Sequence, residues 1–196
     1  MLATGDLQEF LDRVGAEPDA VFAYPTETVY GLGCRITSIA GLERICALKG
    51  REAVKGMIVL VASLEQARAL AVIDERAAAI LNRFWPGPLS VLLPARPGLP
   101  ELLAPGGKIA LRHSPLKEAT AIVEALGPIT STSANPSGQP ASVNFTEVLA
   151  YGLDVDAALD AGATPGGQPS TLIDLSGDAP VCLRPGPIAF DELAGL

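Results

Sequence analysis

The sequence is poor in the residues that usually bind metals or form disulfides. It has one histidine, His113, and three cysteines, which form no CxxC pair. So few ligands argue against a zinc site, and an odd number of cysteines indicates reduced thiols. The sequence therefore predicts no protein-held metal and a cytoplasmic location.

The sequence also lacks long apolar runs. The longest strongly apolar stretch, MIVLVA at residues 57–62, is far shorter than the ~20 residues that a membrane-spanning helix needs. The first basic residue is Arg13 and the chain is polar by residue 4, so we expect no signal peptide. A soluble protein without membrane contact is predicted.

Positive charge is scarce as well. Fourteen lysines and arginines stand against 22 aspartates and glutamates, a net charge of −8. A protein with this balance has no broad basic surface for nucleic acid. We therefore do not expect the chain to bind tRNA directly.

What the sequence does contain is an alternation of helical and strand patterns. Its 196 residues suit one domain, on the usual scale of ~100–200 residues, and we expect a single domain over 1–196. The alternation predicts an α/β fold with an open, twisted mixed sheet and flanking helices. Helices are expected over 7–14, 39–50, 64–71, 74–85, 116–126 and 145–152. Strands are expected over 20–24, 57–62, 89–95, 108–113, 128–132, 157–162, 170–177 and 181–186.

Small polar residues gather in four segments that we expect to be loops next to strands. These segments are YPTETVYGLG (24–33), KGREAVKG (49–56), ITSTSANPSGQPASVN (129–144) and GGQPSTLID (166–174), the last followed by LRPG. Six cations lie in or beside such segments: Lys49, Arg51, Lys55, Lys108, Arg112 and Arg184. The stretches 105–114 and 179–190 contain no acidic residue. Cations without neighbouring carboxylates, next to glycine-rich backbone, indicate an anionic ligand, of which phosphate is the natural candidate.

Other interpretations of single residues stay open. Any one of these cations can be a solvated surface charge. The segment GGKIA lacks the first glycine and the final Ser/Thr of a P-loop. SPLK and SAN match two motifs of penicillin-binding enzymes, but the KTG element is absent. A catalytic triad would depend on His113, but a lone histidine beside Arg112 in an expected strand is more often structural. Cys34, directly after the first of the four segments, can be a reactive thiol but is more often a packing residue.

As a set and in this order, YPTETVYGLGC, KGR, WPGPLS, STSANPSG, PSTLID and LRPG resemble the YrdC-like family of threonylcarbamoyl-AMP synthases. The resemblance runs from about residue 20 to residue 188. It includes the K-x-R and S-x-N signature, here Lys49/Arg51 and Ser133/Asn135. The resemblance implies an open twisted α/β sheet with a large concave cavity. It also implies a nucleotidyltransferase that makes threonylcarbamoyl-AMP and pyrophosphate from L-threonine, bicarbonate or CO2, and ATP, for the threonylcarbamoyladenosine modification of tRNA.

The resemblance also implies roles for residues and partners. Threonine would be bound by Thr28, Arg112, Ser131 and Ser170, with Thr26 close by. ATP would be bound by Arg51, Lys55, Lys108, Ser133, Asn135 and Arg184. Lys49 and Arg51 would be catalytic, through the charge that develops on the phosphates. Mg²⁺ would bridge the phosphates without protein ligands, and the product would pass to a threonylcarbamoyl transferase complex.

Two rival functions share this fold. One is a non-catalytic RNA-binding module, against which the acidic composition weighs. The other is a carbamoyl-transferring enzyme of hydrogenase maturation, in which the same domain is joined to zinc-finger and acylphosphatase-like parts. Longer relatives of the synthase add a second domain, which we do not expect here.

Overall fold

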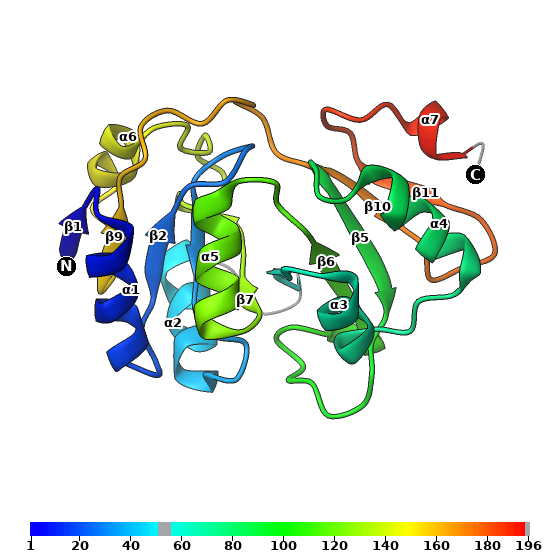
Figure 1. Cartoon of the computed structure of the whole chain (residues 1–196), viewed down its shortest axis with the longest axis horizontal. Helices are drawn as coiled ribbons and strands as arrows, with labels where there is room; N and C mark the ends of the chain where they lie inside the picture. The colour runs from blue at the N-terminus through cyan, green and yellow to red at the C-terminus, as the bar shows by residue number, and fades with distance from the viewer. Residues whose placement is uncertain (51–55, 195–196) are drawn as a thin grey trace.

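The computed structural model describes residues 1–50 and 56–194, which form a mixed α/β fold with helices flanking two sheets (Figure 1). The sequence predicted one mixed sheet, whereas the strands divide into two. The five-stranded sheet has the order β1-β9-β2-β3-β8 and the six-stranded sheet the order β11-β10-β5-β6-β4-β7. Each combines parallel and antiparallel pairs, so both sheets are mixed.

The strands are short and mostly lie where the apolar runs predicted them. The five-stranded sheet consists of β1 (Leu2–Thr4), β2 (Phe22–Tyr24), β3 (Gly31–Gly33), β8 (Thr132–Ser133) and β9 (Ala157–Leu159). The six-stranded sheet consists of β4 (Ile58–Leu60), β5 (Leu89–Pro94), β6 (Lys108–Arg112), β7 (Ile129–Thr130), β10 (Thr171–Asp174) and β11 (Val181–Arg184). Strands β1 and β3 were not predicted, and β3 lies inside the motif that was expected to be a loop throughout.

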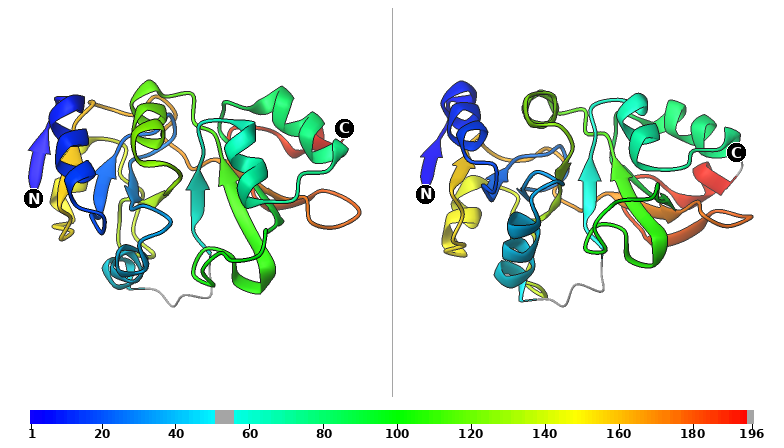
Figure 2. Two further views of the ribbon diagram at one scale, coloured as in Figure 1. Left: turned by 60° about the horizontal axis from the view of Figure 1, so that its bottom comes forward. Right: turned by 90° about the horizontal axis from the view of Figure 1, so that it is seen from below.

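The expected helices are all present. They are α1 (Leu7–Ala16), α2 (Ile39–Lys49), α3 (Leu64–Leu70), α4 (Glu75–Phe84), α5 (Lys117–Leu126) and α6 (Phe145–Ala150), to which the structure adds α7 (Phe190–Ala194) and the short 3-10 helix η1 (Pro105–Gly107). Side chains cap several N-termini, as Asp6 caps α1 and Ser38 caps α2. Helix α2 ends at Gly50, whose φ of 59° suits glycine. Helices α1, α5, α3 and α4 lie on one side of the sheets and α2 on the other (Figure 2).

The division into two sheets occurs within one predicted strand, residues 128–132. Ile129 and Thr130 pair with β4 in the six-stranded sheet, while Thr132 and Ser133 pair with β3 in the five-stranded sheet. Ser131 lies between them, and its N–H donates to the carbonyl of Ile58 at 2.7 Å. The chain therefore crosses from one sheet to the other at this serine, and the polar residues that follow it lie where the sheets meet.

Two apolar clusters hold the helices to the sheets. The larger one joins α2, α3 and α4 to both sheets, with Leu42, Ile80 and Leu111 fully buried. The smaller one packs Phe10 of α1 and Ile122 of α5 against Phe22 of β2. Within the described residues, no helix combines the length and the apolar character that crossing a bilayer requires.

Candidate functional site

A cavity of about 1120 Å³ lies between the two sheets. Its walls come from β3 and β8 of one sheet, from β4, β5, β6, β10 and β11 of the other, and from the polar segments beside them. Every charged side chain in the described part of the lining is a cation: Lys49, Lys108, Arg112 and Arg184. The cavity wall is therefore positive although the whole chain carries a net charge of −8.

All the predicted site residues that the structure describes line this cavity. They are Thr28, Lys49, Lys108, Arg112, Ser131, Ser133, Asn135, Ser170 and Arg184, and Thr26 joins them. Arg51 and Lys55, predicted to bind ATP, lie outside the described residues. The tertiary structure thus brings together residues that are up to 158 positions apart in the chain (26 to 184), and their individual roles remain predictions.

The loop after β2 presents a pair of threonine hydroxyls to the cavity. The Thr26 hydroxyl donates to the Val29 carbonyl at 2.7 Å and lies 2.9 Å from the Thr28 hydroxyl. The Thr26 oxygen also accepts from the backbone N–H groups of Thr28 and Val29, at 3.2 and 3.3 Å. The Thr28 hydroxyl lines the cavity, where it can accept or donate a hydrogen bond.

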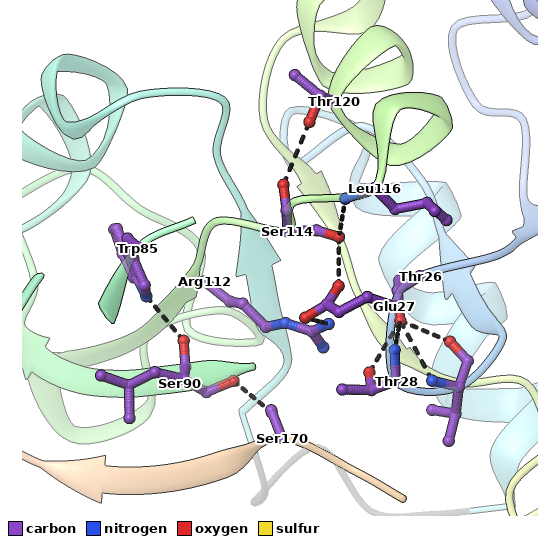
Figure 3. A network of polar contacts seen from close by, with 12 residues as sticks. Thr26, Glu27, Thr28, Trp85, Ser90, Arg112, Ser114, Leu116, Thr120 and Ser170 are labelled. Carbon is purple, nitrogen blue, oxygen red and sulfur yellow. Dashed lines mark hydrogen bonds and ion pairs between the residues drawn. The ribbon is translucent and has the colours of Figure 1, made fainter. Parts of the chain in front are cut away.

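Arg112, at the end of β6, is the most deeply buried arginine of the site, with 4% of its surface exposed. Its Nη2 lies 2.6 Å from Oε1 of Glu27, in a buried ion pair that joins the loop of one sheet to a strand of the other (Figure 3). Its Nε is buried and has no hydrogen-bond partner. A buried donor that points to no protein acceptor, on a side chain that lines a cavity, is suited to bind an anionic ligand group.

Glu27 is a residue that sequence reasoning missed. Its second oxygen accepts a hydrogen bond from the Ser114 hydroxyl, which in turn accepts from the Leu116 N–H (Figure 3). The side chain does not line the cavity itself; it lies behind Arg112. The sequence offered one sign that Glu27 has a role, because it is the only acidic residue of YPTETVYGLGC. Nothing local linked it to Arg112, which is 85 positions away (27 to 112).

Three side chains form a second polar group: one on β5, one immediately before β10 and one on β11. Nε and Nη2 of Arg184 donate to the Ser170 carbonyl at 3.0 and 2.9 Å, and Nη2 also donates to the Ser170 hydroxyl. The Ser170 hydroxyl is 2.8 Å from that of Ser90, which is fully buried and was not predicted. Burial lowers the pKa of Arg184, and the charge of Arg112 lowers it further. Both arginines line the same cavity, so an anionic ligand bound there would interact favourably with both charges.

Lys49 holds the serine-rich segment in place. Its ammonium donates to the carbonyl oxygens of Ser133 and Asn135, at 2.5 and 2.8 Å, and lies 3.5 Å from the Ser133 hydroxyl. The Asn135 side chain donates to the carbonyls of Pro136 and Gln139, while its own Oδ1 is buried without a partner. These contacts join the lysine of K-x-R to both ends of S-x-N, so the lysine shapes the segment that carries the serine.

The inference that the cations have no neighbouring carboxylate was wrong for two of them. Lys108 lies 3.1 Å from Asp174, and Arg112 pairs with Glu27. Both acidic partners are distant in sequence, so the local charge count could not detect them. Burial tends to raise the pKa of Asp174, but hydrogen bonds from Ser176 and the charge of Lys108 lower it overall, so this carboxylate is ionised.

Two residues considered from the sequence lie away from the cavity lining. Cys34 is fully buried, and burial raises the pKa of its thiol to about 12, so it is a packing residue rather than a nucleophile. His113 packs edge-on against Trp85, and burial lowers its pKa despite the charge of Glu27. These positions agree with the prediction from the sequence that His113 is structural and that Cys34 is a packing residue.

Gly166 packs directly on the loop that carries Glu27 and Thr28. Its N–H donates to the Glu27 carbonyl at 2.9 Å, and a Cβ placed on it would lie 2.6 Å from that oxygen. We expect Gly166→Ala to lower the free energy of unfolding by about 1–3 kcal/mol, the usual cost of overpacking. Urea denaturation checks this; Gly177→Ala, where a Cβ has open space, is the control. Equal stability of the two variants would contradict the prediction.

The fold and the site together define an α/β protein with a cationic cavity suited to an anionic ligand. The family model described as "Telomere recombination" (Sua5, YciO and YrdC) matches residues 16–186. The chain therefore belongs to the Sua5/YciO/YrdC family.

Similar proteins in this family carry a specific enzyme name. A threonylcarbamoyl-AMP synthase of Pyrococcus abyssi is 39% identical over 195 residues, which cover 95% of this chain and 57% of the relative. One of Chromobacterium violaceum is 39% identical over 158 residues, 79% of this chain and 82% of the relative. The structure of P. abyssi Sua5 complexed with L-threonine superimposes with a TM-score of 0.90 at 35% identity, over 98% of this chain and 58% of that one. The chain thus spans little more than half the length of the Pyrococcus relative.

Proposed function

We propose that this protein is an L-threonylcarbamoyl-AMP synthase. It would form threonylcarbamoyl-AMP and pyrophosphate from L-threonine, bicarbonate or CO2, and ATP, and so act as a nucleotidyltransferase. The observation that carries the proposal is a cavity whose charged lining residues, among those that the structure describes, are all cations, and whose Arg112 has a buried donor without a protein partner. The relatives named as this enzyme, and the solved relative with bound L-threonine, support the same assignment.

The threonine end would be formed by Arg112, Thr28, Ser131 and Ser170. The guanidinium of Arg112 is placed to bind the carboxylate of the amino acid, because its Nε has no other partner. The Thr28 oxygen can accept a hydrogen bond from the amine. Serine hydroxyls from the sheet junction and from the start of β10 can bind what remains of the small polar substrate.

The ATP end would be formed by the remaining cations and by the serine-rich segment. In the proposed reaction the threonine ammonium gives one proton to bicarbonate, which becomes CO2 and water. The amine nitrogen then bonds to the carbon of CO2 and loses a second proton, which ends on the departing pyrophosphate, and an oxygen of the resulting carbamate attacks the α-phosphorus of ATP. The bond from that phosphorus to the pyrophosphate oxygen breaks, and negative charge grows on the leaving group. Arg184 and Lys108 lie on the cavity wall where they can stabilise this charge, and one such donor is commonly worth about 3 kcal/mol.

ATP would enter as its magnesium complex. The described residues include no cluster of three or more acidic, histidine or cysteine side chains that could hold a metal. The ion would therefore be held by phosphate oxygens and water, the usual arrangement for Mg²⁺ on nucleotides. We also propose that the unstable product is passed to a threonylcarbamoyl transferase complex in the cytoplasm, where tRNA is modified.

The test is pyrophosphate release by the purified protein with ATP, Mg²⁺ and bicarbonate, with and without L-threonine. We expect release that requires both threonine and bicarbonate, together with threonylcarbamoyl-AMP detected by mass spectrometry. A folded protein that releases no pyrophosphate under these conditions would refute the proposal. Salt-sensitive binding of tRNA by such a protein would favour the RNA-binding module instead.

A further inference from the structure

We propose that Glu27 makes the cavity selective for an amino acid over an anion of the same shape that lacks the ammonium group. This inference rests on the proposed function, because it concerns the end of the cavity that would bind threonine. It assigns a specificity-determining role to a side chain that lies outside the cavity lining and acts from behind Arg112.

The charge of the cavity wall poses a problem for an amino acid. The charged groups of its described lining are all cations, with Arg112 and Arg184 among them. Such a wall attracts carboxylates and phosphates but repels an ammonium group. Without a nearby negative charge, the site would favour a hydroxy acid over the corresponding amino acid.

Glu27 supplies the negative charge at this point. Its carboxylate lies 2.6 Å from Nη2 of Arg112 and is only 13% exposed, so water screens its field weakly. The Ser114 hydroxyl fixes the carboxylate from the other side. An α-ammonium is separated from its own carboxylate by a single carbon, so a ligand whose carboxylate binds Arg112 brings its ammonium to the end of the cavity next to Glu27.

The Thr28 hydroxyl also lines the cavity. It can accept a hydrogen bond from an ammonium group or donate one to a hydroxyl, so it does not by itself distinguish an amino acid from a hydroxy acid. The preference for the charged amine is therefore assigned to Glu27.

A purely structural role for Glu27 predicts something different. If Glu27 only held the Arg112 guanidinium in place, its loss would weaken every ligand that binds through a carboxylate. L-threonine and 2,3-dihydroxybutanoate, in which a hydroxyl replaces the ammonium, would then lose affinity equally. Their ratio of affinities separates the two roles.

The experiment is isothermal titration calorimetry of the full chain with L-threonine and with the 2,3-dihydroxybutanoate of matching configuration. We expect Glu27→Gln to lower the preference for threonine at least tenfold. Glu27→Asp, which keeps the charge, should retain the preference within threefold. Glu124→Gln makes the same change at an exposed position and should leave both affinities at the wild-type values.

An unchanged ratio in Glu27→Gln, in a protein that binds threonine, would overturn this inference alone. Wild-type protein that binds no threonine would overturn the proposed function and the inference with it. If Glu27→Gln does not fold, Glu27→Asp decides: a retained preference supports the role of the charge, and a lost preference overturns it.

Discussion

Arg112→Ala is expected to lower the affinity for L-threonine at least a hundredfold while leaving the affinity for ATP unchanged. Arg112 is 4% exposed and its Nε has no protein acceptor, so a carboxylate bound there gains charge-assisted hydrogen bonds that water hardly weakens. Two such bonds, at about 1.5 kcal/mol each, correspond to roughly a hundredfold in affinity. Calorimetric titration with each substrate measures the effect.

The same substitution should also destabilise the protein, because it leaves the Glu27 carboxylate buried without its partner. Removing one member of a buried ion pair typically costs about 3–5 kcal/mol. The double variant Glu27→Gln/Arg112→Ala should recover much of this stability without recovering the affinity for threonine. Arg68→Ala, at an exposed position of α3, is the matched control. Wild-type threonine affinity in folded Arg112→Ala would show that the carboxylate binds elsewhere.

Lys49→Met is expected to lower the free energy of unfolding by about 3 kcal/mol, since two charge-assisted hydrogen bonds are lost. Lys49 is 5% exposed, and its ammonium donates to the carbonyls of Ser133 and Asn135. Methionine keeps the apolar stem and removes the charge. For a domain of this size the loss corresponds to a melting temperature about 6–12 °C lower. Differential scanning calorimetry checks this.

Lys117→Met provides the control for that change, because the Lys117 side chain is 89% exposed. Its melting temperature should match that of the wild type, as is usual for surface substitutions. If Lys49→Met melts at the wild-type temperature yet releases no pyrophosphate, Lys49 acts on the phosphates directly instead of through the segment that it holds.

Much of the fold could be predicted because its signals are local. Helix α2 begins at the cap Ser38 and ends at Gly50, and both residues mark these boundaries in the sequence itself. The apolar run at 108–113 becomes β6, buried along nearly its whole length. Strand β3 was missed because Gly31 and Gly33 are not typical strand residues. Position 33 requires glycine because a Cβ there would lie 2.8 Å from the Tyr24 ring.

The division into two sheets could not be predicted from the sequence. Residues 128–132 form a continuous pattern of short β-prone residues, and nothing local shows that Thr130 and Thr132 pair with strands of different sheets. Strand pairing depends on contacts between distant segments, which single-strand patterns do not contain. That crossing at Ser131 places the predicted serines beside the cavity.

The sequence by itself determined the helices, most strands and the cationic and hydroxyl residues of the site, because helix caps, hydrophobic periodicity and residue chemistry act over a few neighbouring positions. Only the tertiary structure decided what those residues face. It placed Glu27 behind Arg112 and Asp174 beside Lys108, and it turned the Lys49 ammonium onto two backbone carbonyls. Charges interact through space, so the balance of charge at the site depends on partners that only folding brings together.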